Sequence, residues 1–140
     1  MLIQGNDIAY TGSFTKGTQL TTSYIPQETF YLSGDLNTFI AKHNLPKSLM
    51  RSIMCKVGFS RYHFDIAIEN YSEGLKKKLL LASSLCSSDT VALWDEPLNY
   101  IDIPSRIQIE DLLIASKPTM IFVEHDHFFC DKVATKNITI

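Results

Sequence analysis

The sequence has few cysteines, no long apolar run and no marked excess of either charge. Its three cysteines, Cys55, Cys86 and Cys130, are widely spaced and odd in number, which favours reduced thiols over a disulfide framework or a zinc site. No apolar stretch approaches the roughly 18 residues of a membrane span, and the N-terminus does not read as a signal peptide. Lys and Arg number 13 against 15 Asp and Glu, so charge-driven binding of nucleic acid is not expected. These features predict a cytoplasmic globular protein without a membrane span.

The 140 residues are enough for one domain with a sizeable core, and 45% of them are hydrophobic. The chain divides into a β-rich start at 1–30, a helical segment at 31–89 and an alternating part at 90–140. Predicted strands cover residues 7–12, 18–25, 90–94, 119–123 and 133–140, and predicted helices cover 35–43, 46–58, 72–84, 104–115 and 126–132. This order predicts an α/β fold with a mainly parallel sheet and a helical insertion. The continuous apolar runs 90–94 and 119–123 predict strands buried on both faces.

The apolar run 91–94 ends in two adjacent carboxylates, Asp95 and Glu96, followed by Pro97. Ligands of open parallel sheets bind beyond the carboxyl ends of the strands. At that place Asp95 can hold Mg²⁺ through its waters, and Glu96 can polarise an attacking water. The alternative is a solvated loop after a strand, and the neighbouring motifs make this interpretation the weaker one.

A helix is predicted to begin at Ser72, with Gly74 in its first turn. The unpaired N–H groups of a helix N-terminus, a serine hydroxyl and a glycine that permits close approach favour contact with a phosphate. Plain helix capping by Ser72 is the alternative, and taken alone this segment favours it. The three lysines at 76–78 can add positive potential there, but a solvated helix face is the favoured interpretation.

The apolar run 119–123 is followed by Glu124 and His125. An imidazole in this position can donate a hydrogen bond to a phosphate oxygen. His125 and His127 with Asp126 between them do not have an established metal-ligand spacing, so a metal site is not favoured.

These elements, in this order, resemble the ATP-binding cassette (ABC) family of ATPases. The matching segments are the end of the Q-loop strand at 25–27, the signature motif at 71–75, the Walker B motif with its catalytic glutamate at 91–97, the D-loop at 98–102 and the switch histidine at His125. The resemblance implies a partial P-loop NTPase fold.

The residues of these motifs are similar to those of the soluble ABC-F proteins. They are most similar to those in the second cassette of the ribosome-protection members, which act in antibiotic resistance. Three positions depart from the family pattern. Glu73 replaces the first glycine of the signature, Leu75 replaces its final Gln or Glu, and Tyr100 stands where histidine is common. The change at Leu75 weakens a polar contact of the signature.

The sequence has no G-x-x-x-x-G-K-S/T phosphate loop. The segment 12–18 has the right glycine spacing, but Thr18 replaces the lysine and Gln19 the Ser/Thr. Because a β-rich stretch follows rather than a helix, this segment is predicted to be a hairpin turn. The resemblance implies that the chain is the C-terminal portion of a cassette and begins after its phosphate loop.

The resemblance implies roles in ATP binding and hydrolysis for four residues at the chain's own site. Asp95 would hold Mg²⁺, Glu96 would be the general base, Gln27 would contact Mg²⁺ or the attacking water, and His125 would contact the γ-phosphate. Most of the binding energy for a triphosphate comes from the phosphate loop. We therefore expect weak or no ATP binding, and no ATPase activity, from this chain alone.

The resemblance also implies roles at a partner's site. Ser72 and Gly74 would contact the γ-phosphate of ATP held by a second cassette, in cis or in trans, and Asp102 would help couple the two sites. The ribosome is a further expected partner of the full-length protein. Exposed apolar sheet surface predicts self-association of the chain. Two alternatives stay open: a non-catalytic remnant or dimerisation module, and the ATP-binding subunit of an ABC transporter.

Overall fold

Three parallel strands form the centre of the molecule in the computed structural model, which describes residues 2–139. They are β1 (Thr22–Ile25), β2 (Val91–Asp95) and β3 (Met120–Val123), in the spatial order β1-β2-β3. Ile25 lies opposite Trp94, and Asp95 lies opposite Val123. The carboxyl ends of the three strands therefore lie at the same end of the sheet, which is called the carboxyl edge below. The predicted α/β fold with a parallel sheet is confirmed.

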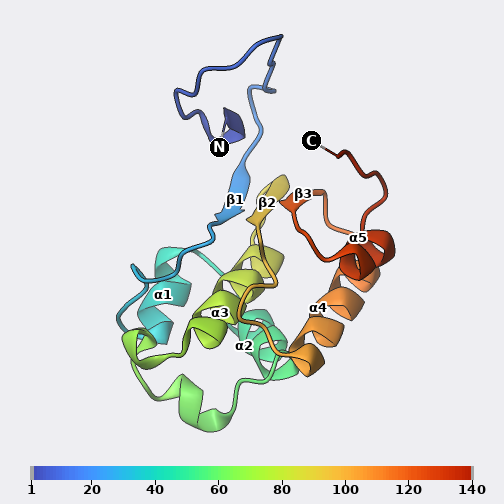
Figure 1. The fold of residues 1–140 in the computed structure, drawn as a ribbon. Helices are drawn as coiled ribbons and strands as arrows, with labels where there is room; N and C mark the ends of the chain where they lie inside the picture. Colours follow the sequence, from blue (N-terminus) through green and yellow to red (C-terminus); the bar gives the residue numbers. More distant parts are fainter. Residues whose placement is uncertain (1, 140) are drawn as a thin grey trace.

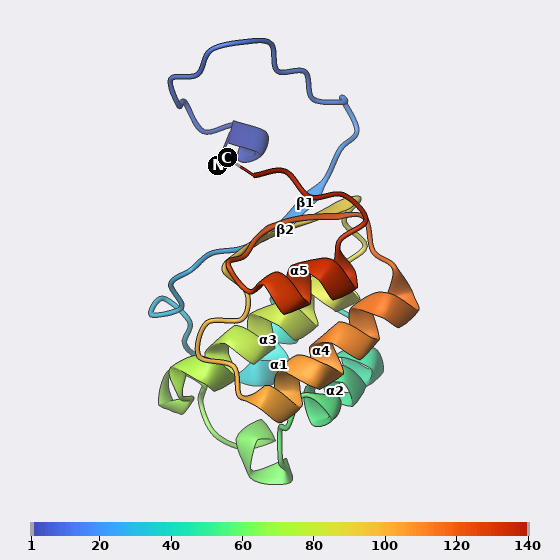
Figure 2. The ribbon, with the colours of Figure 1, turned by 45° about the vertical axis from the view of Figure 1, so that its right-hand side comes forward.

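Helices cover one side of this sheet. The helices are α1 (Leu36–Lys42), α2 (Lys47–Lys56), α3 (Glu73–Cys86), α4 (Ile103–Ser116) and α5 (His127–Val133), with short 3₁₀ helices at Leu2–Gln4, Arg61–Phe64 and Ile68–Asn70. Figures 1 and 2 show all five on the same side, while the N-terminal segment lies beyond the other side. Helices α1 to α3 are inserted between β1 and β2, as the sequence predicts. Within residues 2–139 no helix has the length and apolar character needed to cross a membrane.

The core forms where α3 packs under β1 and β2. Four successive residues of β2 are buried, and the most bulky of them, Trp94, has no exposed surface. Its indole Nε1 donates a hydrogen bond to Ser84 Oγ of α3 at 2.8 Å. Since successive residues of a strand point to opposite faces, β2 is buried on both faces, in agreement with its continuous apolar run.

Strand β3 corrects one expectation, because it is an edge strand and not buried on both faces. Met120 and Phe122 are half-buried on the helix side, but Ile121 and Val123 are 49% and 44% exposed. Phe122 packs edge-on against Phe129 of α5, with ring centroids 5.3 Å apart. The opposite face of β3 therefore presents apolar side chains.

Two predicted strands do not form. Residues 7–12 have no regular structure, and the segment predicted as a strand at 133–140 begins inside α5 and continues without strand pairing to residue 139. Residue 140 lies outside the described residues. A strand needs a neighbour for its backbone N–H and C=O groups, and in the described chain neither segment has one. The strand predicted at 18–25 is shorter, since β1 begins at Thr22.

The predicted hairpin turn at 12–18 is wrong, because no paired strands flank it in the described chain. A turn at residues 18–19 leads directly towards β1. No helix follows the two glycines, so the segment lacks the helix N-terminus that a phosphate loop must open.

Candidate functional site

The carboxyl edge of the sheet brings together Glu96 and His125, which the sequence places 29 positions apart. Glu96 has a φ of 47°, a left-handed conformation that turns the chain sharply after β2, and its N–H donates to the Val123 carbonyl at 2.9 Å. Its carboxylate accepts from Asn99 Nδ2 at 2.6 Å and lies 3.6 Å from His125 Nε2. The side chain of Glu96 is 25% exposed, while that of His125 is 84% exposed. This arrangement holds one acid between an amide donor and an accessible imidazole.

Asp95 ends β2 beside this pair. Its Oδ2 accepts a hydrogen bond from the Tyr24 hydroxyl of β1 at 3.3 Å. Burial, and secondarily the Asp95 charge, raises the pKa of Tyr24, which favours the protonated phenol that donates to this carboxylate. Asp95 is half-buried.

The donor set at this edge fits Mg²⁺ better than a transition metal. Within the described residues, no group of three or more His, Cys, Asp and Glu side chains is arranged to hold a metal ion. Mg²⁺ does not require such a cage, since it is usually held by one or two carboxylates together with waters and substrate phosphates. Asp95, with Glu96 next to it, supplies this kind of oxygen ligand.

Gln27 lies two positions after the end of β1, in the loop next to the end of β2. Its side chain is exposed, and the structure fixes its backbone, since its carbonyl accepts from Lys77 Nζ at 3.4 Å. The four residues expected at the chain's own site, Gln27, Asp95, Glu96 and His125, therefore all lie at the carboxyl edge.

The N-terminus of α3 presents Ser72 and Gly74. Ser72 caps the helix, with its Oγ accepting from the Leu75 N–H at 3.2 Å, so the capping interpretation is correct as far as it goes. Gly74 lies against the Tyr100 carbonyl, and a Cβ at this position would be only 2.5 Å from that oxygen. Glycine is thus required here by close approach of the segment after Glu96, which ties the helix start to the chain after β2.

Replacing Gly74 with Ala is expected to destabilise the fold by about 2 kcal/mol, because the methyl group must displace a backbone carbonyl. In an open helix the same change would be favourable by about 1 kcal/mol. Urea unfolding followed by the fluorescence of Trp94, the single tryptophan, measures the effect. Gly17→Ala is the matched control, since nothing lies within 4 Å of its Cβ position. Equal stability of the two variants would contradict the prediction.

Asp102 is engaged within its own chain. It caps α4, with Oδ2 accepting from the Ser105 N–H at 3.1 Å, and its Oδ1 lies 2.5 Å from Lys78 Nζ. The Lys78 hydrogen bond, aided by Ser105, lowers the pKa of Asp102 to about 2. Asp102 thereby links the N-terminus of α4 to helix α3, and half of its side chain remains exposed.

The lysines at 76–78 correct the expectation of a solvated helix face. Lys76, Lys77 and Lys78 are 8%, 0% and 7% exposed. Lys76 pairs with Glu73 at 3.4 Å, and Lys78 pairs with Asp102. Lys77 donates to backbone carbonyls at the ends of β1 and β2. Sequence reasoning missed the roles of Lys77 and Lys78 because their partners lie 18 to 51 positions away.

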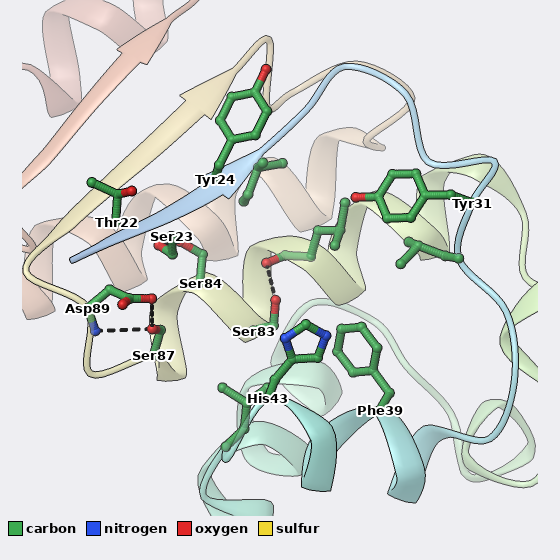
Figure 3. A pocket seen from close by; sticks show the side chains of 14 residues that line it. Thr22, Ser23, Tyr24, Tyr31, Phe39, His43, Ser83, Ser84, Ser87 and Asp89 are labelled. Carbon is green, nitrogen blue, oxygen red and sulfur yellow. Dashed lines mark hydrogen bonds between the residues drawn. The ribbon is translucent and has the colours of Figure 1, made fainter. Parts of the chain in front are cut away.

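A separate cavity of about 280 Å³ lies between β1, α1 and α3 (Figure 3). Hydroxyl groups of Ser23, Ser83 and Ser84 line it together with Tyr31 and His43. None of the predicted site residues lines this cavity. Tyr24, whose hydroxyl donates to Asp95, does line it, so the cavity borders the carboxyl edge.

No model of a protein family matches the chain. Individual proteins do match it. An uncharacterized ABC transporter ATP-binding protein of Bacillus subtilis, YkpA, is 27% identical over 146 aligned residues, covering 99% of this chain and 27% of the relative. The ribosome protection protein VmlR of the same organism is 30% identical over 91 residues, covering 65% of this chain and 17% of that protein. The homologues of this chain are ABC ATP-binding proteins.

The structural comparison agrees with this ABC homology. A chain in the crystal structure of the complex of archaeal ribosomal stalk protein aP1 and ribosome recycling factor aABCE1 superposes with a TM-score of 0.75. The match covers 94% of this chain and 27% of the other at 21% identity, so it establishes the fold. The chain is a partial domain of the ABC ATPase fold, and it spans about a quarter or less of the ABC proteins described above.

Proposed function

We propose that this chain supplies the water-activating residues of one ATP site and the signature surface of a second ATP site in a pair of ABC cassettes. The observation that carries the proposal is the placement of Glu96 between Asn99 and His125, next to Asp95, at the carboxyl edge of the sheet. The homology to ABC ATP-binding proteins supports the same reaction.

In this proposal Asp95 contributes a carboxylate ligand to Mg²⁺, which when bound stabilises the charge on the transferring phosphate. Glu96 accepts the proton of the attacking water, and the hydrogen bond from Asn99 holds the carboxylate in place. His125 is exposed beside Glu96 and offers a ring N–H to the γ-phosphate. Gln27, on the loop after β1, contacts Mg²⁺ or the attacking water.

The remaining residues act on ATP held by a partner cassette. The first-turn N–H groups of α3, the Ser72 hydroxyl and the glycine at Gly74 form a surface suited to a phosphate oxygen. Asp102, at the N-terminus of α4, couples the two sites through its hydrogen bond with Lys78 of α3. A second cassette, in cis or in trans, is thus the partner that this function requires.

The described residues do not form a cradle for the phosphates of ATP. The segment 12–18 has Thr18 at the position of the phosphate-loop lysine and is not followed by a helix. A calorimetric titration of MgATP into the 140-residue chain is therefore expected to show no saturable binding, with a Kd weaker than about 1 mM. Micromolar binding that Asp95→Ala abolishes would contradict this expectation.

The proposed function is tested by supplying the missing cradle. A segment with a phosphate loop, taken from an ABC ATP-binding relative, is fused to the N-terminus of the chain, and ATP hydrolysis is measured as phosphate release. The fused protein should hydrolyse ATP with dependence on Mg²⁺, while the unfused chain should not. A folded fused protein that forms a dimer and binds ATP but does not hydrolyse it would overturn the proposal.

We further propose that the full-length protein acts at the ribosome as an ABC-F protein in the cytoplasm. The wording of the motifs and the similarity to VmlR, a ribosome protection protein, support this partner. The transporter alternative rests on the name of YkpA. Co-sedimentation of the full-length protein with ribosomes in the presence of ATP distinguishes the two, since a transporter subunit would instead remain in the supernatant.

Self-association is the expected behaviour of the chain by itself. Ile121 and Val123 are apolar, exposed and adjacent on one face of the edge strand β3. Light scattering after size exclusion should report a dimer or larger species, and Val123→Lys should shift it toward the monomer. A monodisperse wild-type monomer would contradict this prediction.

A further inference from the structure

Lys77 is the most deeply buried charged side chain of residues 2–139, and the function proposed above does not use it. It is 0% exposed, although lysine is almost never fully buried unless paired. Its ammonium donates to the Pro26 carbonyl at 2.7 Å and lies 3.4 Å from the carbonyls of Gln27 and Asp95. Three donors thus meet three acceptors, all of them backbone oxygens at the ends of β1 and β2.

This bonding explains how the charge is tolerated. Burial lowers the pKa of Lys77, while the carboxylates of Asp95, Glu96 and Glu124 oppose the shift. Buried ammonium groups need both hydrogen bonds and nearby negative charge. The position of Lys77 therefore depends on the carbonyl oxygens next to the carboxyl edge and on the carboxylates of that edge.

A second side chain fixes the same loop to α3 one turn earlier. The Glu73 carboxylate accepts a hydrogen bond from the Thr29 hydroxyl, and Thr29 is only 3% exposed. Positions 73 and 77 are four residues apart and lie on one face of the helix. The loop at 26–29, which carries Gln27, is thus held to α3 at both of its ends.

We propose that Lys77 is a positioning residue that fixes the Gln27 loop and the Asp95 backbone to helix α3. The start of α3 carries Ser72 and Gly74, so the residues that serve the chain's own ATP site and those that serve the partner's site move as one body. The attachment of the loop and of the Asp95 backbone to α3 follows from the contacts alone, and its link to the ATP sites rests on the proposed function.

Amide hydrogen exchange of the 140-residue chain without nucleotide tests whether Lys77 fixes the loop at 26–29 and the Asp95 backbone to α3. Two reporter amides flank these contacts: Glu96, bonded to the Val123 carbonyl, and Leu32, bonded to the Thr29 carbonyl. In Lys77→Met both should exchange about tenfold faster, while the remote amide of Lys117, bonded to the Leu113 carbonyl, should change less than about twofold. Lys132→Met, which removes only a surface pair with Glu110, is the matched control and should change none of the three.

Equal acceleration at all three amides, or none, would overturn the proposal, because either result would leave Lys77 without a local effect. Thr29→Val removes the second attachment and keeps the test open if Lys77→Met does not fold. This variant should accelerate Leu32 about tenfold and leave Glu96 within about twofold. No change at Leu32 would contradict the attachment of the loop at 26–29 to α3.

Kinetics of the fused protein test the link to the ATP sites. Lys77→Met should lower kcat about tenfold or more with KM for ATP within about threefold, because the cradle lies on the fused segment and only the alignment of Glu96 and Gln27 is lost. A raised KM with unchanged kcat would overturn the link. If the fused protein has no activity at all, the proposed function fails, and the exchange experiment still decides the role of Lys77.

Discussion

Replacing Glu96 with Gln is expected to lower ATP hydrolysis by the fused protein about 100- to 10,000-fold, with little change in KM for ATP. Gln has the same shape, and its carbonyl oxygen can still accept the hydrogen bond that Asn99 donates to Glu96. It cannot take a proton from water. The variant therefore removes the proposed base and keeps the geometry, which confines the expected loss to kcat.

The control for this substitution is Asp111→Asn, which neutralises an exposed carboxylate on α4. Its kcat should remain within about twofold of the wild-type value, because a surface charge distant from the reaction contributes little. ATP binding by both variants, measured by calorimetry, should equal that of the unsubstituted fused protein. If Glu96→Gln retained more than about a tenth of the activity, Glu96 would not be the general base.

The local parts of the fold could be predicted because their signals are contained in short segments. The run Val91–Trp94 is apolar throughout and becomes the central strand, and Ser72 begins the helix that it was expected to cap. The two carboxylates after β2 and the histidine after β3 followed from the rule that parallel strands end at one edge.

The failures concern features that depend on distant neighbours. The predicted strand at 133–140 has a strand-like composition, but pairing decides whether a strand forms, and in residues 2–139 no segment pairs with it. The run 119–123 was expected to be buried on both faces, although its position at the sheet edge leaves Ile121 exposed. Neither result can be read from a window of one sequence.

The burial of the lysines has a different cause. A hydrophobic pattern treats every lysine as surface, yet each of the three at 76–78 has a long apolar stem that packs in the core. The ammonium groups of Lys77 and Lys78 are satisfied by partners far away in the chain, the Pro26 carbonyl and Asp102. The only signal in the sequence was negative: the three lysines occupy consecutive positions, and a helix cannot turn all of them to one solvated side.

Asp102→Asn is expected to destabilise the fold by about 2 kcal/mol at pH 7, because it leaves the Lys78 ammonium buried without its charged partner. Asn remains a good helix cap, so the loss of charge is isolated from the loss of the cap. Urea unfolding followed by Trp94 fluorescence measures the change. The double variant Lys78→Met with Asp102→Asn should recover most of the stability, because neither partner is then left unpaired. An additive effect of the two substitutions would contradict a direct interaction.

The pH dependence of the same variant gives an independent check. The pKa of Asp102 is about 2 in the folded chain against an ordinary value of 3.8, so the folded state favours the ionised form. Its stabilising contribution is present above pH 3.8 and is lost as the pH falls through 3.8 toward 2. The side chain is half exposed, so solvent screening limits the contribution of this ionisation to about 1 kcal/mol.

The stability difference between wild type and Asp102→Asn should therefore stay constant from pH 7 to about pH 5. It should lose about half of this pH-dependent part by pH 3, because a protonated Asp102 resembles Asn. A difference that does not change over this range would mean that the Lys78 ammonium does not depend on the Asp102 charge.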